Sequence, residues 1–271
     1  MKKLFAGFLS LTLFTYSPIT SLSVSAQEEN SNNELSVEEN NGFSESELSA
    51  EDLLVEIEET NANTQSVQSF TELDIRLQNS EETSYSFVYA DFYIFYDQAN
   101  KVTEGYIYTE SDNNGQTENT EALLLEGDSA SYTRNKTNGD WEDFSEGEFA
   151  VNPDFHQLLA SVVSIGDELT VYENEESYVL TNTHSDIDLF SPFQSHYSLS
   201  FSGVDASQYE QTIFIEFNKD DLRFKHIDLD FNFEEEDSHI NLSVNSTFDL
   251  WNKINEDFVD QVHSGEIEIP Y

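Results

Sequence analysis

Residues 84–97 read SYSFVYADFYIFYD and are dense in aromatic and β-branched side chains. This composition predicts a long β-strand. Because alternate side chains of a strand point to opposite faces, the two faces can be separated in the sequence. One face would carry Tyr85, Phe87, Tyr89, Tyr93 and Phe95, and the other would carry Val88, Ala90, Phe92, Ile94 and Tyr96. Since both faces are apolar, we expect both to be covered, by a helix, a second sheet or an apolar ligand.

The segments around this strand predict an antiparallel sheet. Alternating apolar and polar residues indicate strands at 70–77, 102–109, 169–172, 178–181, 197–202, 212–217, 227–234 and 240–248. Shorter strands are predicted at 123–125 and 131–134, with a hairpin turn at Asn138-Gly139 between Tyr132 and Trp141. A succession of neighbouring hairpins favours a meander over βαβ units, so the predicted fold class is α+β.

Two helices are predicted from their caps and apolar stripes. Ser49 and Asp52 have capping-box spacing at the start of the first helix. In the second, Asn152 would be the N-cap, Pro153 the first helical residue and Gly166 the left-handed residue after the end. We expect this second helix to dock on the strand at 84–97. Trp251, Ile254 and Phe258 suggest a short third helix or turn.

The amino-terminal residues predict export. Lys2 and Lys3, an apolar run and the small residues before Gln27 indicate a signal peptide over residues 1–26. A membrane anchor is the alternative, but the apolar run is well short of the ~20 residues that span a bilayer. Residues 27–47 are predicted to be a disordered acidic tether, and residues 48–271 a single domain. We therefore expect a secreted protein, with association with the cell envelope as a further option.

The charge is strongly acidic, with 55 Asp and Glu residues against 10 Lys and Arg and a net charge of −45. Such a surface repels nucleic acid and anionic membranes, so neither is an expected partner. Two interpretations remain open, cation binding and a hydrated surface suited to high salt. Because the acidic residues are spread along the whole chain, we favour adaptation to high salt.

Motifs for catalysis or metal binding are absent from the sequence. It has no cysteine, no His pair with HExxH spacing and no GxSxG motif. Asp112 begins a loop that resembles an EF-hand, but Thr117 and Leu123 occupy the positions that need Gly and Glu, which favours a plain turn. The pairs Asp186/Asp188 and Asp228/Asp230 each place two carboxylates on one strand face, as a hydrolase could. We expect no enzyme activity, no cofactor and no metal.

The order of elements resembles a known group of proteins. The resemblance rests on three features: the residues Ser66, Val67, Ser69 and Phe70 after the first helix, the hairpin from Tyr132 to Trp141, and the Ile-Glu-Ile-Pro ending at Pro270. The chain resembles uncharacterised secreted proteins and lipoproteins of Gram-positive bacteria that share the LolA/LppX-like fold. This resemblance implies a strongly curved antiparallel sheet, an incomplete barrel, wrapped around two or three helices. Many such proteins carry a lipobox cysteine where this chain has Gln27, so no stable membrane anchor is expected.

The resemblance implies a carrier, because its superfamily includes carriers of lipoproteins and lipids. We expect a non-enzymatic protein that holds an apolar small molecule, an acyl chain or an acylated or hydrophobic peptide between sheet and helices. A cell-envelope interaction module that binds protein or wall polymer is the main alternative, and the oligomeric state is left open. The predicted lining residues are Tyr85, Phe87, Tyr89, Phe92, Tyr93, Phe95, Tyr106 and Tyr108.

Overall fold

The structure is a computed structural model that describes most of the chain after residue 41. The described residues are 7–9, 22–24, 42–79, 83–125, 131–135, 139–144, 149, 151–184, 187–199, 201–202, 208–235 and 238–269. Most of the predicted signal peptide and tether, together with Asn138, Asp186 and Pro270, lies outside them. The single-domain assignment of residues 48–271 and the export of the chain stay predictions.

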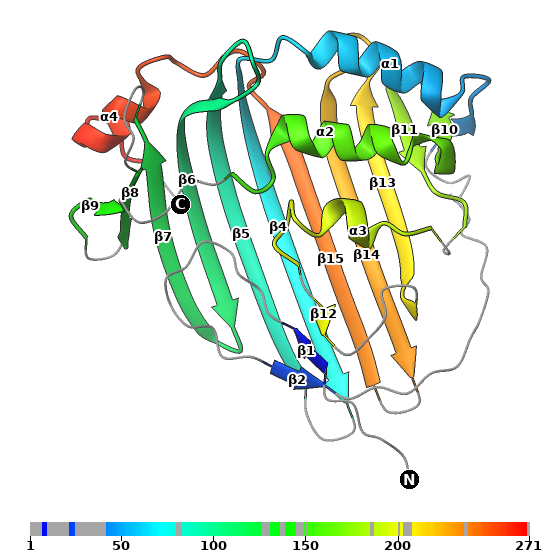
Figure 1. Cartoon of the computed structure of the whole chain (residues 1–271), viewed down its shortest axis with the longest axis horizontal. Helices are drawn as coiled ribbons and strands as arrows, with labels where there is room; N and C mark the ends of the chain where they lie inside the picture. Colours follow the sequence, from blue (N-terminus) through cyan, green and yellow to red (C-terminus); the bar gives the residue numbers. More distant parts are fainter. Residues whose placement is uncertain are drawn as a thin grey trace. The chain divides into compact units, whose positions relative to one another are not determined.

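The described strands form two antiparallel sheets. The larger is open and has twelve strands in the order β3-β10-β11-β13-β14-β15-β4-β5-β6-β7-β8-β9 (Figure 1). The smaller has the order β12-β1-β2. The predicted antiparallel sheet is therefore confirmed. The strands are β1 (Gly7–Leu9), β2 (Leu22–Val24), β3 (Ser44–Glu45), β4 (Ser66–Asn79), β5 (Thr83–Tyr96), β6 (Val102–Asn113), β7 (Gln116–Leu124), β8 (Ser131–Asn135), β9 (Glu142–Phe144), β10 (Thr170–Glu173), β11 (Ser177–Thr181), β12 (Phe201–Ser202), β13 (Glu210–Asn218), β14 (Phe224–Glu235) and β15 (Ser238–Asp249).

Four α-helices occur in the described residues: α1 (Ala50–Asn61), α2 (Phe155–Ser164), α3 (Phe190–Phe193) and α4 (Phe258–Ser264). None of these helices has the length and apolarity needed to cross a bilayer. The chain divides into two compact units. Unit 1 comprises residues 1–60, 73–86 and 152–245, and unit 2 comprises residues 61–72, 87–151 and 246–271.

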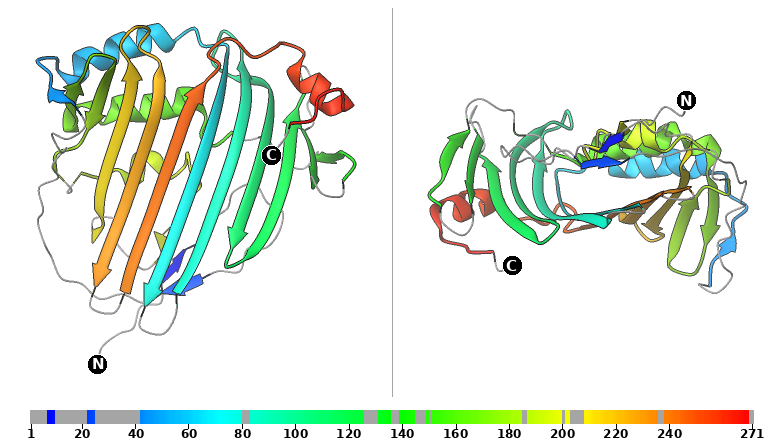
Figure 2. Two further views of the ribbon diagram at one scale, coloured as in Figure 1. Left: turned by 180° about the vertical axis from the view of Figure 1, so that it is seen from behind. Right: turned by 90° about the horizontal axis from the view of Figure 1, so that it is seen from below.

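Unit 1 has an apolar core between its helices and its strands. Figures 1 and 2 show α2 and α3 on one side of β13 and β14. The ring of Phe155 in α2 lies 5.6 Å from that of Phe224 in β14, and Phe224 in turn lies 4.5 Å from Phe217 in β13. In α3, Phe190 lies edge-on to Phe231 of β14 at 6.1 Å. The second predicted helix therefore packs on β14, whereas we expected it on the strand at 84–97.

The capping predictions hold for α1 and fail for α2. Ser49 Oγ accepts a hydrogen bond from the Asp52 backbone N–H at 3.1 Å, as the capping box predicts. The N-cap of α2 is Asp154, whose side chain accepts from the Gln157 N–H at 2.9 Å, and not Asn152. Gly166 is not left-handed after α2 but begins a short 3₁₀-helix (Gly166–Glu168). A Cβ at this position would lie 2.7 Å from Leu54 Cδ1, so the Leu54 side chain would have to shift to admit any other residue.

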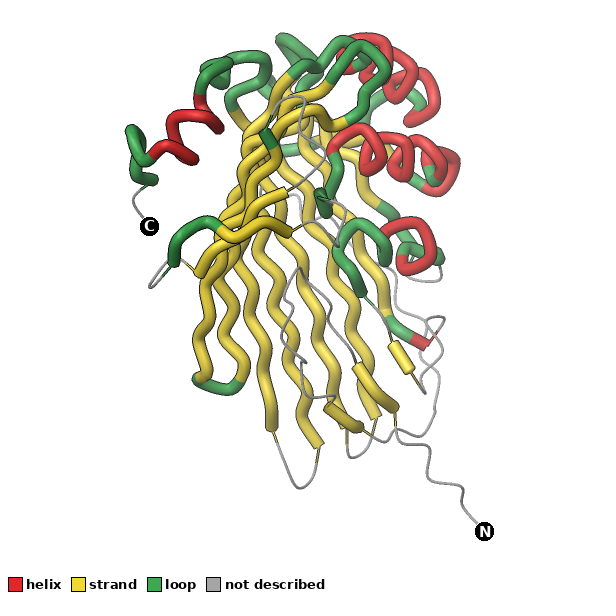
Figure 3. Tube along the Cα trace, turned by 60° about the vertical axis from the view of Figure 1, so that its left-hand side comes forward, coloured by secondary structure: helices red, strands yellow, loops and turns green. Residues whose placement is uncertain are grey.

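Two segments differ from the predicted elements. Residues 197–199 were expected in a strand, but Ser198 has a left-handed φ of 51° and the Leu199 N–H donates to the Gln194 carbonyl, so the chain turns there. Only Phe201–Ser202 of that segment is a strand, β12. The β6–β7 turn is the one that Asp112–Gly115 predicts: Asn114 and Gly115 both have positive φ, and Asp112 Oδ1 accepts from the Gly115 N–H at 2.7 Å. Figure 3 shows the described helices in red, the strands in yellow and the loops and turns in green.

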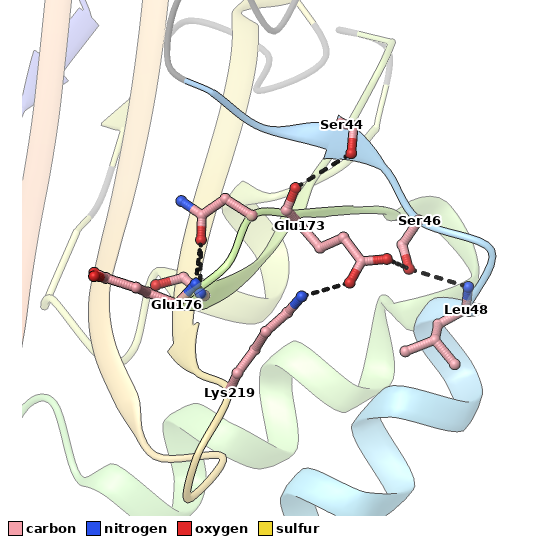
Figure 4. A network of polar contacts seen from close by, with 8 residues as sticks. Ser44, Ser46, Leu48, Glu173, Glu176 and Lys219 are labelled. Atoms are coloured by element: carbon pink, nitrogen blue, oxygen red, sulfur yellow. Dashed lines mark hydrogen bonds and ion pairs between the residues drawn. The ribbon is translucent and has the colours of Figure 1, made fainter.

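The short strand β3 (Ser44–Glu45) lies before residue 48. Within the range predicted as tether, β3 pairs with β10, with Glu45 opposite Tyr172. Figure 4 shows how side chains hold this pairing. Glu173 accepts hydrogen bonds from Ser46 Oγ at 2.6 Å and from Lys219 Nζ at 2.5 Å.

Candidate ligand-binding face

The predicted strand at residues 84–97 is confirmed as β5, and its two faces differ in burial. Alternate residues from Ser84 to Tyr96 are buried, including Phe92. The opposite set, with the exception of Asp91, is half-buried or exposed, and Tyr85 is 42% exposed. The expected cover is therefore complete on one face of β5 and only partial on the aromatic side.

This aromatic side continues over the neighbouring strands of unit 2. The ring of Tyr89 lies 6.5 Å from Phe70 in β4 and 6.3 Å from Tyr108 in β6. Tyr93 lies 6.1 Å from Tyr106 in β6. We call this surface the aromatic face and define it by the half-buried or buried rings Phe70, Phe87, Tyr89, Tyr93, Phe95, Tyr106 and Tyr108.

The strand register extends the aromatic face toward β7 and β8. Tyr106 lies opposite Leu123 of β7, and Leu123 lies opposite Tyr132 of β8. In the next row, Tyr108 lies opposite Glu121, and Glu121 lies opposite Arg134. Because directly opposite residues share a face in an antiparallel pair, each row is aligned across three strands.

The short helix α4 covers part of the aromatic face. Phe258 stacks on Tyr93, with ring centroids 4.4 Å apart, and meets Tyr106 edge-on at 6.2 Å. Val259 and Val262 of α4 are buried in the same cluster as Tyr106, Tyr108 and Leu123. The predicted helix or turn near Phe258 is thus α4, and one of the covers expected for β5 comes from the carboxyl end of the chain.

Polar groups lie among these rings. Gln68 Nε2 donates to Asp91 Oδ1 at 3.1 Å and to the Tyr93 hydroxyl at 2.8 Å. Asp91 is 2% exposed and sits between Tyr89 and Tyr93 in the β5 alternation. Burial, followed by the charge of Asp91, raises the pKa of the Tyr93 phenol above its ordinary value.

The neighbouring phenols are in a similar negative field. Burial, then the charges of Asp91 and Glu72, raise the pKa of Tyr89. Tyr108 donates from its hydroxyl to Glu110 Oε2 at 2.9 Å, and burial together with that carboxylate raises its pKa. These phenols therefore stay protonated and can act as hydrogen-bond donors across the ordinary range of pH.

At the β7–β8 end, a buried carboxylate anchors the arrangement. Glu121 accepts from the Tyr106 hydroxyl at 2.6 Å and from Arg134 Nε at 2.5 Å. The Arg134 guanidinium lies 4.2 Å over the ring of Trp141, so it is held between a carboxylate and an indole. His263 of α4 lies beside Trp141 at 5.9 Å. The site thus combines apolar rings with hydrogen-bonded charges.

The structure brings together most of the predicted lining residues. Tyr89, Tyr93 and Phe95 pack with the cluster of Tyr106 and Tyr108, and Phe87 shares their row in β5. Phe92 is on the opposite side of β5, so it does not line the same surface, and the exposed Tyr85 belongs to unit 1.

Sequence reasoning missed the polar partners of these rings. Asp91 carried a signal, because it is the single interruption of the aromatic alternation in 84–97. Gln68, Glu121 and Arg134 carried none, since each depends on a neighbouring strand whose register the sequence does not define.

The pair Asp228/Asp230, considered above as a hydrolase site, interacts with neighbouring side chains of unit 1. Asp228 Oδ1 accepts from Asn245 Nδ2 at 2.9 Å and lies 3.0 Å from His226 Nε2. Burial, then the charge of Asp228, raises the pKa of Asp230. In the part of the chain that the structure describes, no three His, Asp or Glu residues are grouped closely enough to hold a metal ion.

Comparisons with known proteins give distant matches. No protein-family model and no curated protein matches this chain. Among solved structures, LprF from Mycobacterium bovis is similar at 13% identity, over 74% of this chain and 92% of that one, with a TM-score of 0.39. A DUF1329 family protein from Desulfovibrio piger is similar at 12% identity, over 77% and 94%, with a TM-score of 0.22. A LolA superfamily protein from Nitrosomonas europaea is similar at 9% identity, over 78% and 99%, with a TM-score of 0.17.

Proposed function

We propose that this protein is a secreted, non-enzymatic binding protein that holds an apolar ligand on the aromatic face. The proposal includes a LolA/LppX-like architecture in which the sheet curves around its helices. One observation carries it: Phe87, Tyr89, Tyr93 and Phe95 remain only half-buried although β5 lies in the interior of the sheet order. Solvated rings in such a position are costly unless another molecule completes their burial.

The energetics favour an apolar ligand at this place. Full burial of a large apolar side chain contributes roughly 1.5–3 kcal/mol, so several half-buried rings retain much of this free energy for binding. Stacked and edge-on rings also accept flat or chain-like apolar groups without rearranging. The hydroxyls of Tyr89 and Tyr93 would orient a polar end of the ligand.

The helix α4 would act as the movable cover. It has seven residues, and helices this short are marginal in water without tertiary contacts. Its hold on the aromatic face comes from Phe258, Val259 and Val262. A ligand that replaces these contacts could therefore displace α4 at modest cost.

Binding of an uncharged fluorescent fatty-acyl amide tests the proposal. We expect the Tyr89→Ala variant to bind the probe about tenfold more weakly, which corresponds to about 1.4 kcal/mol of lost contact. Phe214→Ala is the matched control, because Phe214 is a half-buried aromatic residue of β13 in unit 1. Its affinity should equal that of the wild type.

Native mass spectrometry of protein purified from its own host gives an independent check. A co-purifying apolar molecule whose occupancy falls in the Tyr89→Ala protein supports the proposal. A bare mass under mild conditions, together with probe affinities that are equal in the wild type and both variants, would refute it. That result would favour the envelope-module alternative.

A further inference from the structure

The aromatic face combines rings with carboxylates. Asp91 lies in the same alternating row of β5 as Tyr89 and Tyr93, and Glu110 accepts the hydroxyl hydrogen of Tyr108. The charge of Glu72 acts on the phenol of Tyr89. The charges that act on these three phenols come from Asp91, Glu72, Glu110 and Glu121 and from the neighbouring Tyr89 phenol. The face therefore has an electrostatic preference as well as an apolar one.

Two cationic side chains of this protein lie next to aromatic rings. Arg134 lies 4.2 Å over Trp141 and donates to Glu121 at 2.5 Å. In unit 1, Lys219 lies 4.6 Å over Tyr178 and donates to Glu173 at 2.5 Å. In both places a cation is held between the face of an aromatic ring and a carboxylate. The aromatic face offers the same two components, on a larger surface.

We propose that the ligand of the aromatic face is a small cationic amphiphile, with an ammonium head and an alkyl body. This inference rests on the function proposed above and names the chemical class of the ligand. With α4 displaced, the head lies against the rings of Tyr89, Tyr93 and Tyr108, in the field of Asp91. The alkyl body extends along the row from Tyr89 toward Phe87.

Physical chemistry favours this class over anionic lipids. An ammonium group over a ring is attracted by the ring quadrupole, and the attraction grows when water is excluded. Asp91, at 2% exposure, acts through the poorly polarisable protein interior, where charges interact more strongly than in water. A carboxylate or phosphate head would meet like charge instead, both here and across a chain of net charge −45.

Three amphiphiles with the same alkyl chain test the inference: decyltrimethylammonium, decyl maltoside and decyl sulfate, each below its micelle-forming concentration. In calorimetric titrations at about 0.15 M salt, where long-range attraction is largely screened, we expect one site per chain. The ammonium probe should bind about tenfold more tightly than the maltoside, and the sulfate should bind most weakly.

Charge variants separate the site from general attraction. Asp91→Asn keeps the shape of the side chain and its acceptor oxygen for Gln68. It should weaken ammonium binding about fivefold and leave maltoside binding unchanged. Asp228→Asn, which removes the same charge from β14 in unit 1, should change neither affinity. If Asp91→Asn does not fold, the exposed Glu72→Gln takes its place.

The outcomes distinguish the two proposals. If maltoside and ammonium bind equally, or if Asp228→Asn weakens ammonium binding as much as Asp91→Asn, the cationic preference is refuted while the apolar site stands. If no amphiphile binds at all and no lipid co-purifies, the proposed function fails and this inference fails with it.

Discussion

Glu121 is the residue on which the β6, β7 and β8 end of the aromatic face depends. Its side chain is 3% exposed and binds both the Tyr106 hydroxyl and the Arg134 guanidinium. Removal of one partner from a buried ion pair leaves an unpaired buried charge. We expect Glu121→Ala to lower the free energy of unfolding by about 3 kcal/mol, measured by urea denaturation.

An exposed ion pair provides the control for this prediction. Arg76 and Asp74 form a salt bridge whose arginine side chain is 68% exposed. Removal of Asp74 should cost much less than removal of Glu121, because such exposed pairs are weak in water. Equal losses for Glu121→Ala and Asp74→Ala would show that the buried pair does not anchor this end of the face.

Residue roles were predictable only where they depend on near neighbours in the sequence. The Ser49–Asp52 cap spans three residues and was predicted correctly. Gly166 was predicted for its freedom at a helix end, whereas in the structure it lies against the Leu54 side chain, which is remote in sequence. The polar partners of the aromatic face belong to this second kind, since Gln68 and Asp91 meet only once β4 and β5 pair.

The strand β3 illustrates an element that side chains hold in place. Its pairing with β10 covers only two residues and is reinforced by the contacts of Glu173 with Ser46 and Lys219. These contacts lower the pKa of Glu173, with the Lys219 hydrogen bond as the largest cause. Because about one third of the Glu173 side chain is exposed to water, each contact is weakened by screening. The pairing should therefore open locally, without global unfolding.

Hydrogen exchange of the β3 amides at neutral pH measures this opening. The Ser46 N–H donates to the Val171 carbonyl at 2.9 Å and reports directly on the pairing. In Glu173→Gln we expect exchange about two- to fivefold faster in residues 44–46, the effect of a weak exposed pair. Glu175→Gln, in the neighbouring exposed loop, should leave exchange unchanged. Equal exchange in both variants would rule out the side-chain contribution.

Strands with a regular sequence pattern were predictable, and segments with irregular backbone structure were not. β13, β14 and β15 alternate cleanly in sequence and β5 is dense in aromatic and β-branched residues, and all four were predicted within a few residues. Tyr197, Leu199 and Phe201 alternate as well, yet a turn bends that segment after α3. The competing signal was local, because a hydrogen bond from Leu199 back to Gln194 closes a turn that period-two reasoning ignores.

On the scale of the whole molecule, the stability of the fold depends on the shifted pKa values of several side chains and on the net charge. The contact with Asp228 raises the pKa of His226. The contribution of this contact to the free energy of unfolding is therefore present below about pH 6.5 and is lost as the pH rises through the raised pKa. Burial raises the pKa of Asp230, which also favours the folded state as the pH falls. His196 acts in the opposite sense, because burial lowers its pKa. Glu173 and Glu216 have lowered pKa values, so their contribution is lost in acid, below about pH 4.5.

The remaining and largest influence on the stability of the folded chain is mutual repulsion among its 55 acidic residues, which only 10 basic residues oppose. Salt shortens the Debye length to ~3 Å at 1 M, so repulsion in the folded chain should be screened. We expect the melting temperature at pH 7.5 to rise by about 5–10 °C between low salt and 1 M NaCl, which for this size corresponds to a few kcal/mol. The rise should shrink near pH 5, where part of the repulsion is already relieved by protonation.

The identity of the salt decides between the two interpretations of the acidic surface. Screening depends on ionic strength alone, so NaCl and KCl should raise the melting temperature equally and without saturation. A bound cation would instead stabilise the folded state through mass action, with a rise that saturates at a low concentration of one ion. Calorimetric scans with Ca²⁺ at millimolar concentration make the comparison. A large, saturating rise with Ca²⁺ would contradict the screening account, because millimolar Ca²⁺ barely changes the Debye length.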